Sequence, residues 1–470
     1  MSTEHQNGTS STAVIQPVEL QPSPSNQEQN RTKQPFVGGR SLGSINTDDN
    51  GNDRNESLPS PTTASQPQET WKDPKGNVYK VTAAFWAFIV MGMNDATYGA
   101  IIPYLQTYYN LRYAIVSLVF LSPFVGYTAS ALLNNAIHLR FGQRGVASLG
   151  PLCHLLAYII NCIHPPFPVL VLSFILAGFG NGLLDAGWNA WIGAMANANE
   201  MLGFLHAFYG LGATIAPLIA TSMITKANLP WFNWYYCMVG FAGLELAWSI
   251  HAFWAASGIK FREANGRTSD AKGSRLREAV FQLPAARVTW LCALFLLGYV
   301  GVEVALGGWI VEFMIQVRHA APFPSGMSAT GYWLGMTVGR VVLGFVTPKI
   351  GEKLAIMIYI PIAMGLELIF WLVPQFYVST FAAALIGFFL GPLFPAVVVV
   401  CTKLLPKHLH VSSIGFAAAF GGSGGAILPY AVGAIAQAKG VGVLQPIVLA
   451  LMAVILLLWF GLPRMNKKQD

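Results

Sequence analysis

Acidic residues at Asp95, Asp185 and Glu303 each interrupt a long apolar stretch of the 470-residue sequence. Asn181, Asp185 and Asn189 are spaced four residues apart, so a helix would carry their side chains on one face. A carboxyl group inside a membrane is costly and is by default a functional candidate. It can take up a proton on one side and release it on the other, or it can bind a polar solute. The alternative is that such a carboxyl only hydrogen-bonds neighbouring helices.

The elements that must position these residues are membrane-spanning helices. Hydrophobic residues make up 54% of the sequence and charged residues 10%, well outside the range of a soluble domain. About 20 apolar residues cross a bilayer as a helix, because the backbone there must satisfy its own hydrogen bonds. We predict an all-α membrane protein with 12 transmembrane helices, at 81–105, 113–137, 146–163, 168–194, 201–224, 233–256, 288–314, 326–347, 354–373, 377–401, 412–437 and 443–462.

Basic residues orient these spans. With a cytosolic N-terminus, the inner loops and flanks hold 19 Lys and Arg, whereas the opposite loops hold four. The positive-inside rule therefore predicts that both termini are cytosolic, and the net charge of +7 does not argue for nucleic acid. The predicted organisation is a disordered cytosolic tail at 1–77, a six-helix half at 78–256, a cytosolic central loop at 257–287, a second six-helix half at 288–462 and a cytosolic tail at 463–470.

The two halves are related in sequence. GFLHAFYGLGATIAP at 203–217 and GFAAAFGGSGGAILP at 415–429 share eight of 15 residues without a gap, at a separation of 212 positions. Gly126 and Gly142 lie 209 positions before Gly335 and Gly351. Glycine-rich spans resemble one another by composition, since small residues are common where such helices pack. The identities include two phenylalanines and the proline, however, which favours the parallel duplication found in many secondary transporters.

Several motifs resemble those of the major facilitator superfamily. GFVTPKIGEK at 344–353 is similar to the signature that follows the second helix of each half in that family. The first-half counterpart, NAIHLRFGQR at 135–144, lacks the leading glycine and the aspartate, which calls the usual inner-gate ion pair into question. FGNGLLDAGWNAWIG at 179–193, HAFYGLGATIAP at 206–217, and GGW at 307–309 followed by TVGR at 337–340 resemble the fucose-permease-like branch, and most closely its fungal bypass-of-stop-codon family.

The resemblance implies two pseudo-symmetric six-helix halves and alternating access. In that family helices 1, 4, 7 and 10 line the central cavity, so Asp95 and Glu303 are expected to face each other across the substrate path. The fucose-permease branch carries cavity carboxylates on its first and fourth helices for proton coupling and sugar binding. By resemblance, Asp95 and Asp185 are the candidates for those roles.

Further polar residues complete the candidate site. Arg340 either pairs with a carboxylate or anchors the inner end of its span, and His206 either binds substrate or bridges helices. Glu245 and Glu367 fall in spans that lie outside the cavity in that family, which favours a structural or lipid-interface role. Amides and aromatic rings suit polyols, although rings in spans are also common as core. The full set for substrate binding or proton coupling is Asp95, Asn94, Asn181, Asp185, Asn189, Trp188, His206, Tyr209, Glu303, Trp309 and Arg340.

These features predict a secondary transporter that moves a small solute by alternating access. Proton-coupled symport of a sugar-like neutral substrate leads, because no Lys or Arg in the first-half cavity could pair with an anion. The alternatives are a proton-coupled exporter of a cationic or amphipathic compound, and a non-transporting sensor. We predict no enzyme activity, cofactor or metal, since no nucleophile–base or metal-ligand spacing occurs. The expected partners are the substrate, the proton and the lipid bilayer, with the chain as a monomer.

The plasma membrane is the favoured location. Lys467 and Lys468 resemble a dilysine retrieval signal, so the endoplasmic reticulum or another internal membrane is the alternative. Sequons at Asn7, Asn30 and Asn55 would require an external tail, and we attribute them to the Asn/Ser/Thr-rich composition of 1–77.

Overall fold

Residues 69–196, 198–265, 276–406 and 409–463 are described by the structure, which is a computed structural model. All regular elements in these ranges are helices. Most of the predicted N-terminal tail, part of the predicted central loop and the C-terminal Lys467 and Lys468 lie outside the described residues.

The first half is built from α1 (Gly76–Tyr109), α2 (Tyr113–Val116), α3 (Leu118–Cys162), α4 (Phe167–Gly193), α5 (Ala198–Thr225) and α6 (Asn233–Phe253), and α7 (Gly258–Asn265) follows. Two predicted spans are joined in α3, which kinks at Gly142 with φ of 71°. A Cβ at Gly142 would lie 2.5 Å from the Ala256 carbonyl oxygen, so this bend needs glycine. The two predicted spans are therefore two helical stretches that meet at the non-helical Gly142, which lies in the predicted connection between them.

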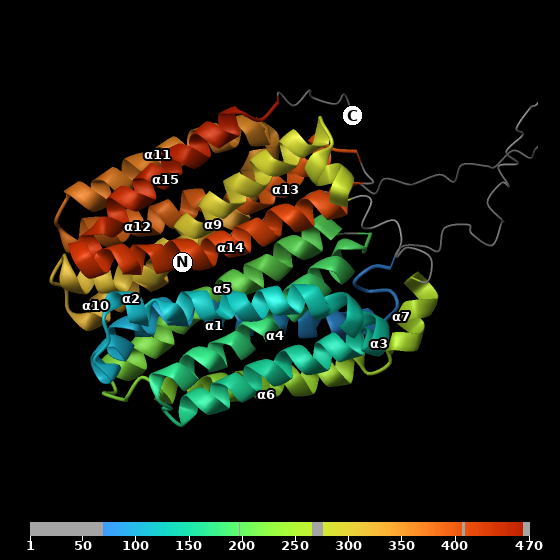
Figure 1. The fold of residues 1–470 in the computed structure, drawn as a ribbon, viewed down its shortest axis with the longest axis horizontal. Coiled ribbons are helices and arrows are strands. Elements are labelled where there is room, and N and C mark those ends of the chain that lie inside the picture. The colour runs from blue at the N-terminus through green and yellow to red at the C-terminus, as the bar shows by residue number, and fades with distance from the viewer. Residues whose placement is uncertain (1–68, 197, 266–275, 407–408, 464–470) are drawn as a thin grey trace, which may run out of the picture. The chain divides into compact units, whose positions relative to one another are not determined.

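The second half comprises α9 (Ala285–Gln316), α10 (Pro322–Ile350), α11 (Glu352–Leu372), α12 (Phe376–Leu390), α13 (Leu393–Leu404), α14 (His410–Lys439), η3 (Val441–Val443) and α15 (Leu444–Phe460). Helices α12 and α13 form one predicted span, interrupted at Gly391 and Pro392 because proline cannot donate a backbone hydrogen bond. Figure 1 shows the two halves as separate layers, with α9 to α15 above α1 to α7.

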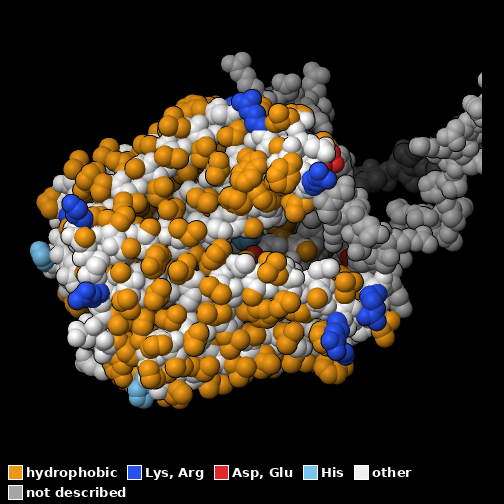
Figure 2. All heavy atoms as spheres, in the orientation of Figure 1, with side chains coloured by type: hydrophobic (Ala, Val, Ile, Leu, Met, Phe, Trp, Pro, Cys, Tyr) orange, Lys and Arg blue, Asp and Glu red, His pale blue; other side chains and the backbone are white. Residues whose placement is uncertain are grey.

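The helices account for the predicted spans. In the described ranges, nine segments are long and apolar enough to cross a membrane, judged by length and composition. One of them, Tyr113–Cys162, contains two predicted spans, and the less apolar α6 and α10 supply the remaining two. Side chains on the drawn face are mostly hydrophobic, with Lys and Arg near its two ends (Figure 2). This is the surface expected of an integral membrane protein.

Equivalent glycines hold equivalent helices together in the two halves. A Cβ at Gly212 on α5 would lie 2.1 Å from the Ile89 carbonyl oxygen on α1. A Cβ at Gly424 on α14 would lie 1.9 Å from the Leu297 carbonyl oxygen on α9. The residues of the second contact are those that the sequence repeat makes equivalent to the residues of the first. The same holds for the contact of Gly126 with the Ile175 carbonyl oxygen and that of Gly335 with the Ala384 carbonyl oxygen. The predicted pseudo-symmetry is thus present as backbone contacts that only glycine permits.

The halves meet closely at one end of the helices. We use the term distal end for the end of the bundle where the C-termini of α1 and α9 lie. The opposite end, where α1 begins and α15 ends, is the proximal end. Toward the distal end, a Cβ at Gly99 would lie 2.2 Å from the Gly307 carbonyl oxygen, and Tyr113 donates a 3.0 Å hydrogen bond to Glu312 Oε1. The halves are therefore closed against each other there.

Apolar packing is different at the proximal end. One core cluster contains residues of both halves, whereas a second, which includes Val81, Leu205 and Phe253, is made entirely of first-half residues. The surface is hollowed between the two halves, and an acidic side chain is visible inside (Figure 2).

Candidate functional site

Asp95 lies at the centre of a hydrogen-bonded cluster from three helices. Its Oδ1 accepts hydrogen bonds from Asn94 Nδ2 at 3.0 Å and from Asn181 Nδ2 at 2.9 Å. Its Oδ2 accepts one from the Tyr209 hydroxyl at 2.8 Å. Asn94, Asn181 and Tyr209 were all predicted from the sequence as site residues, and each of them hydrogen-bonds Asp95. The close crossing of α1 and α5 positions Tyr209, since a Cβ at Gly92 would lie 2.0 Å from the Tyr209 carbonyl oxygen.

Asp185 has its own cluster along α4. Asn189 Nδ2 donates to Asp185 Oδ1 at 2.7 Å, as the four-residue spacing predicts, and the Tyr127 hydroxyl donates to Asp185 Oδ2. His206 Nε2 lies 3.2 Å from Asn189 Oδ1. The cluster therefore extends from α4 to α5 and offers carboxylate, amide and imidazole groups.

Glu303 and Arg340 form the charged pair of the second half. Arg340 Nη2 lies 2.7 Å from Glu303 Oε1, and the two side chains are 13% and 8% exposed. Of the two roles considered for Arg340, pairing with a carboxylate is the one observed. Tyr209, which binds Asp95, is close enough to Glu303 and Arg340 to interact with their charges. The expected facing of Asp95 and Glu303 across the substrate path stays a prediction, and the structure shows one cluster on each half.

Two predicted binding residues lie elsewhere. Trp188 is fully buried and stacks on Phe253 at 4.2 Å between ring centroids, inside the first-half core. Trp309 is also buried, and its Nε1 donates to the Pro429 carbonyl oxygen at 2.9 Å. Its ring packs 5.9 Å from that of Tyr113, so it belongs to the distal closure. Neither ring lines the polar clusters in this conformation.

Sequence reasoning missed several members of the network. Tyr127 binds Asp185, and Tyr158 donates to Asn94 Oδ1 at 3.2 Å. Their sequence context does not distinguish them from tyrosines of an interface belt. Glu312 carried a usable signal, because it is a second carboxyl in the apolar segment that holds Glu303. In the described ranges, no three His, Cys, Asp or Glu side chains are grouped so as to hold a metal ion.

The duplicated halves differ where the site lies. With the offsets of the repeat, Phe394 and Val398 in the second half correspond to Asp185 and Asn189 in the first, and Ala418 corresponds to His206. The second half is thus apolar at the positions where the first half has its polar cluster.

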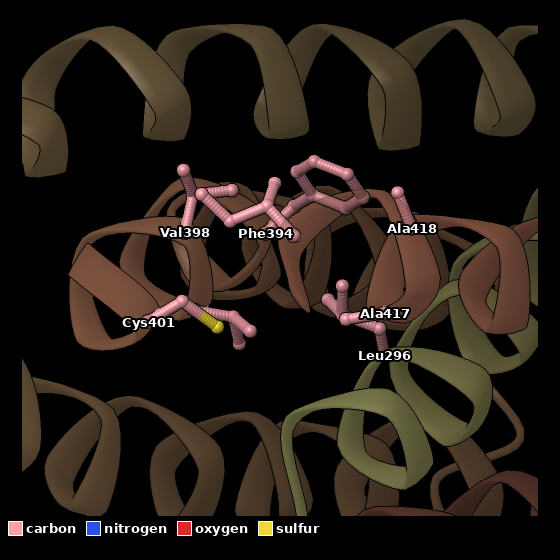
Figure 3. A pocket seen from close by; sticks show the side chains of 8 residues that line it. Leu296, Phe394, Val398, Cys401, Ala417 and Ala418 are labelled. Atoms are coloured by element: carbon pink, nitrogen blue, oxygen red, sulfur yellow. The ribbon is translucent and has the colours of Figure 1, made fainter. Parts of the chain in front are cut away.

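These second-half residues line a small apolar pocket between α9, α13 and α14 (Figure 3). Its lining carries no charged side chain and consists of Leu296, Phe394, Val397, Val398, Cys401, Ile414, Ala417 and Ala418. The Phe394 ring lies 6.3 Å from the His206 ring of the opposite half. The polar cluster and the apolar pocket are therefore neighbours across the interface of the halves.

Comparison with known proteins identifies relatives over most of the chain. The sequence matches the family described as the Major Facilitator Superfamily at residues 84–429 and 302–470. It is 29% identical to Bypass of stop codon protein 6 of Saccharomyces cerevisiae, over 83% of this chain and 84% of that one. It is 22% identical to a glucose/mannose transporter of Bacillus subtilis, over 74% of this chain and 85% of that one.

Solved structures have the same fold. A D-xylose-proton symporter superimposes with a TM-score of 0.68 at 14% identity, covering 84% of this chain and 99% of that one. The transporter FucP in its outward conformation gives a TM-score of 0.58 at 16% identity, covering 82% of this chain and 99% of that one. The predicted all-α fold and the resemblance drawn from the motifs are both confirmed.

Proposed function

Because the chain belongs to the Major Facilitator Superfamily, whose members transport solutes across membranes, we propose that it is a proton-coupled symporter of a neutral, sugar-like solute. The observation that carries this proposal is Asp95, a carboxylate held by Asn94, Asn181 and Tyr209 between the halves. All three donors are neutral groups, so the carboxyl has no fixed counter-charge in its own cluster.

Asp95 is the coupling group in this proposal. Neither Asp95 nor Asp185 forms an ion pair with Lys or Arg among the described residues. A carboxyl group in a membrane-spanning helix without such a partner is a candidate to bind and release a proton. Its amide and hydroxyl neighbours can rearrange to serve either protonation state. Proton binding and release at Asp95 would then accompany each transport cycle.

The polar groups favour a neutral solute. Arg340 is already paired with Glu303, so it is not free to hold an anion. Asn181, Asn189 and His206 supply donors and acceptors that match hydroxyl groups, and the Phe394 ring opposite can cover an apolar sugar face. The relatives named as glucose/mannose and D-xylose-proton transporters support a sugar in this role.

Alternating access would use the distal closure. Opening that end separates Gly99 from Gly307 and breaks the bond between Tyr113 and Glu312. With both termini in the cytosol, as the distribution of basic residues predicts, this conformation faces the cytosol. We propose the plasma membrane as its location.

A second candidate is export of an amphipathic compound. The apolar side chains opposite His206, such as Phe394, favour it, because an apolar group could contact them while a polar group reaches Asp185. The two functions differ in the direction of coupled movement, which a vesicle experiment resolves.

The test is uptake into proteoliposomes with a defined pH gradient. The probes are labelled D-glucose, D-mannose, D-galactose and D-xylose, with a lipophilic cation as the probe for export. Symport predicts accumulation of at least one sugar toward the alkaline side, and Asp95→Asn should abolish accumulation while retaining exchange, because the amide keeps hydrogen bonds but cannot cycle a proton. Asp73→Asn, the same change at an exposed carboxyl before α1, is the matched control. Unchanged accumulation in Asp95→Asn would contradict the proposal.

A further inference from the structure

Two seams join the halves. We call the α5/α10 seam the one where α5 packs on α10, and the α3/α14 seam the one where α3 packs on α14. The sequence repeat relates α5 to α14 at a separation of 212 positions, and α3 to α10 at a separation of 209. Each contact in one seam therefore has a defined counterpart in the other, so the seams can be compared position by position.

At the distal end the two seams make equivalent contacts. A Cβ at Gly326 on α10 would lie 2.2 Å from Thr221 Oγ1 on α5. A Cβ at Gly433 on α14 would lie 2.6 Å from Oγ of Ser117, which precedes α3. Gly433 is the counterpart of Thr221 in the repeat. Ser117 is the counterpart of Gly326, so the glycine and the hydroxyl have changed sides while the close approach has been kept.

The seams differ three helical turns nearer the proximal end. In the α5/α10 seam, Gly210 and Thr337 are each 11 residues from the distal contact, and a Cβ at Gly210 would lie 2.4 Å from Thr337 Oγ1. Their counterparts, Gly422 and Thr128, are again a glycine and a threonine. Among the described residues, however, no atom lies within 4 Å of the Cβ that a residue other than glycine would carry at Gly422. Gly210 is buried, whereas Gly422 and Thr128 are both exposed.

Gly422 and Thr128 lie on the faces that would meet if the α3/α14 seam closed. Eleven residues make about three turns of an α-helix, so Gly422 shares a face of α14 with Gly433. By the same spacing Thr128 shares a face of α3 with Ser117. These two faces touch at the distal end and have parted about 16 Å further along. The α3/α14 seam is therefore open at the depth where the α5/α10 seam is closed.

The conformation described here gives no packing reason for glycine at position 422. Glycine in the middle of a helix is destabilising relative to alanine, because it loses more conformational freedom on folding. At Gly424 this cost accompanies a close approach to α9 that alanine would prevent. At Gly422 the described residues make no such approach. A second conformation, in which a neighbour lies against Gly422, would supply the reason.

We infer that Thr128 packs against Gly422 when the proximal end closes, and that this contact completes the closure of the α3/α14 seam. The inference rests on the alternating access of the proposed function. In the closed form the Thr128 side chain lies on the bare backbone at Gly422, as Thr337 lies on Gly210 in the conformation described here. Substitutions at these two positions should therefore change the balance between conformations more than the stability of this one.

The direct test is a disulfide between Thr128→Cys and Gly422→Cys in the full-length protein, reconstituted in lipid vesicles. In the α5/α10 seam a Cβ at Gly210 would lie 3.2 Å from Thr337 Cβ, close to the separation of about 3.8 Å in disulfides. We expect an oxidant to link the two introduced cysteines progressively, because each closure can be captured, and mass spectrometry identifies the linked peptides.

Two proteins serve as controls for the disulfide. Thr128→Cys combined with Ile427→Cys should not link, since Ile427 is exposed but lies about 140° around α14 from Gly422. The wild type, whose five cysteines are free, shows whether any native pair links under the same conditions.

Alanine at Gly422 tests the same contact without a crosslink. It meets no neighbour in the conformation described here, but in the closed form its Cβ would overlap Thr128, whose branched side chain has little freedom to turn away. Labelling of a Ser117→Cys variant from the distal side reports the conformation that is open there. We expect Gly422→Ala to lower the labelling rate about tenfold, and Gly422→Ala/Thr128→Ala to restore it. Gly240→Ala, at another exposed glycine without a neighbour within 4 Å among the described residues, should leave the rate unchanged.

The inference is overturned if the Thr128→Cys/Gly422→Cys pair does not link while Ser117→Cys is labelled from the distal side. It is also overturned if Ser117→Cys is never labelled, because the halves then do not exchange conformations. Equal labelling rates with glycine and alanine at position 422 would contradict it as well. If the disulfide forms but wild type accumulates none of the sugars, the proposed function fails and the contact stands.

Discussion

Replacing Gly424 by alanine should separate α14 from α9. The added Cβ would lie 1.9 Å from the Leu297 carbonyl oxygen, whereas ordinary contacts begin at 3.4 Å, so the helices must move apart by about 1.5 Å. Backbone atoms cannot rotate away as side chains can, so the strain remains. Overpacking of this kind costs about 1–3 kcal/mol. The alanine also raises helix propensity by up to about 1 kcal/mol, which reduces the net loss.

The same helix provides a control. Gly422 has no atom within 4 Å of its would-be Cβ, so Gly422→Ala should be neutral or slightly stabilising. Thermal unfolding of the detergent-solubilised variants measures both. Gly212→Ala should repeat the effect of Gly424→Ala, because it contacts Ile89 in the equivalent crossing. Equal melting temperatures for Gly424→Ala and Gly422→Ala would refute the reasoning that these crossings require glycine.

Three further outcomes are expected. Glu303→Gln or Arg340→Gln alone should destabilise the protein by about 3–5 kcal/mol by leaving one buried charge, and the double variant by less, in thermal unfolding. Tyr113→Phe removes the hydrogen bond to Glu312 and should make the distal end open more often. A thiol reagent added from the distal side should then label a Ser117→Cys variant about five times faster, and an unchanged rate would show that this hydrogen bond does not hold the distal end closed. An N-terminally tagged wild type should be found at the cell surface, as should the variant with Lys467 and Lys468 changed to Ser; a wild type in internal membranes that moves to the surface in the variant would instead identify a retrieval signal.

The fold could be predicted well because the hydropathy of the spans and the duplication of the halves can be read from the order of the residues alone. Span positions follow from apolar length, and the glycines at 212 and 424 mark the crossings that the structure contains. The break inside a span, at Gly391 and Pro392, was not predicted, because the hydropathy of 377–401 is continuous across it.

The candidate site was predictable only in part. The spacing of Asp185 and Asn189 identified their shared face, since helical geometry is local. Contacts between distant segments were not predictable in this way. Trp309 carries an indole group suited to a sugar, yet the neighbouring Pro429 carbonyl binds it at the distal closure. His154 and Glu245 lie 91 positions apart, and only the packing of α3 on α6 brings them together.

The glycine crossings have a consequence for how this transporter can change. In the equivalent contacts a glycine lies against the backbone of the other helix, so the contact does not depend on the identity of the neighbouring side chains. The second copy could therefore exchange the acid and amide equivalent to Asp185 and Asn189 for Phe394 and Val398 while its helices continued to cross in the same way. In the proposed function, the residues that bind the solute are therefore different from the glycine contacts that hold the helices together. New selectivity can arise in one copy by substitution at a few facing positions, while the motion that both copies share is left unaltered.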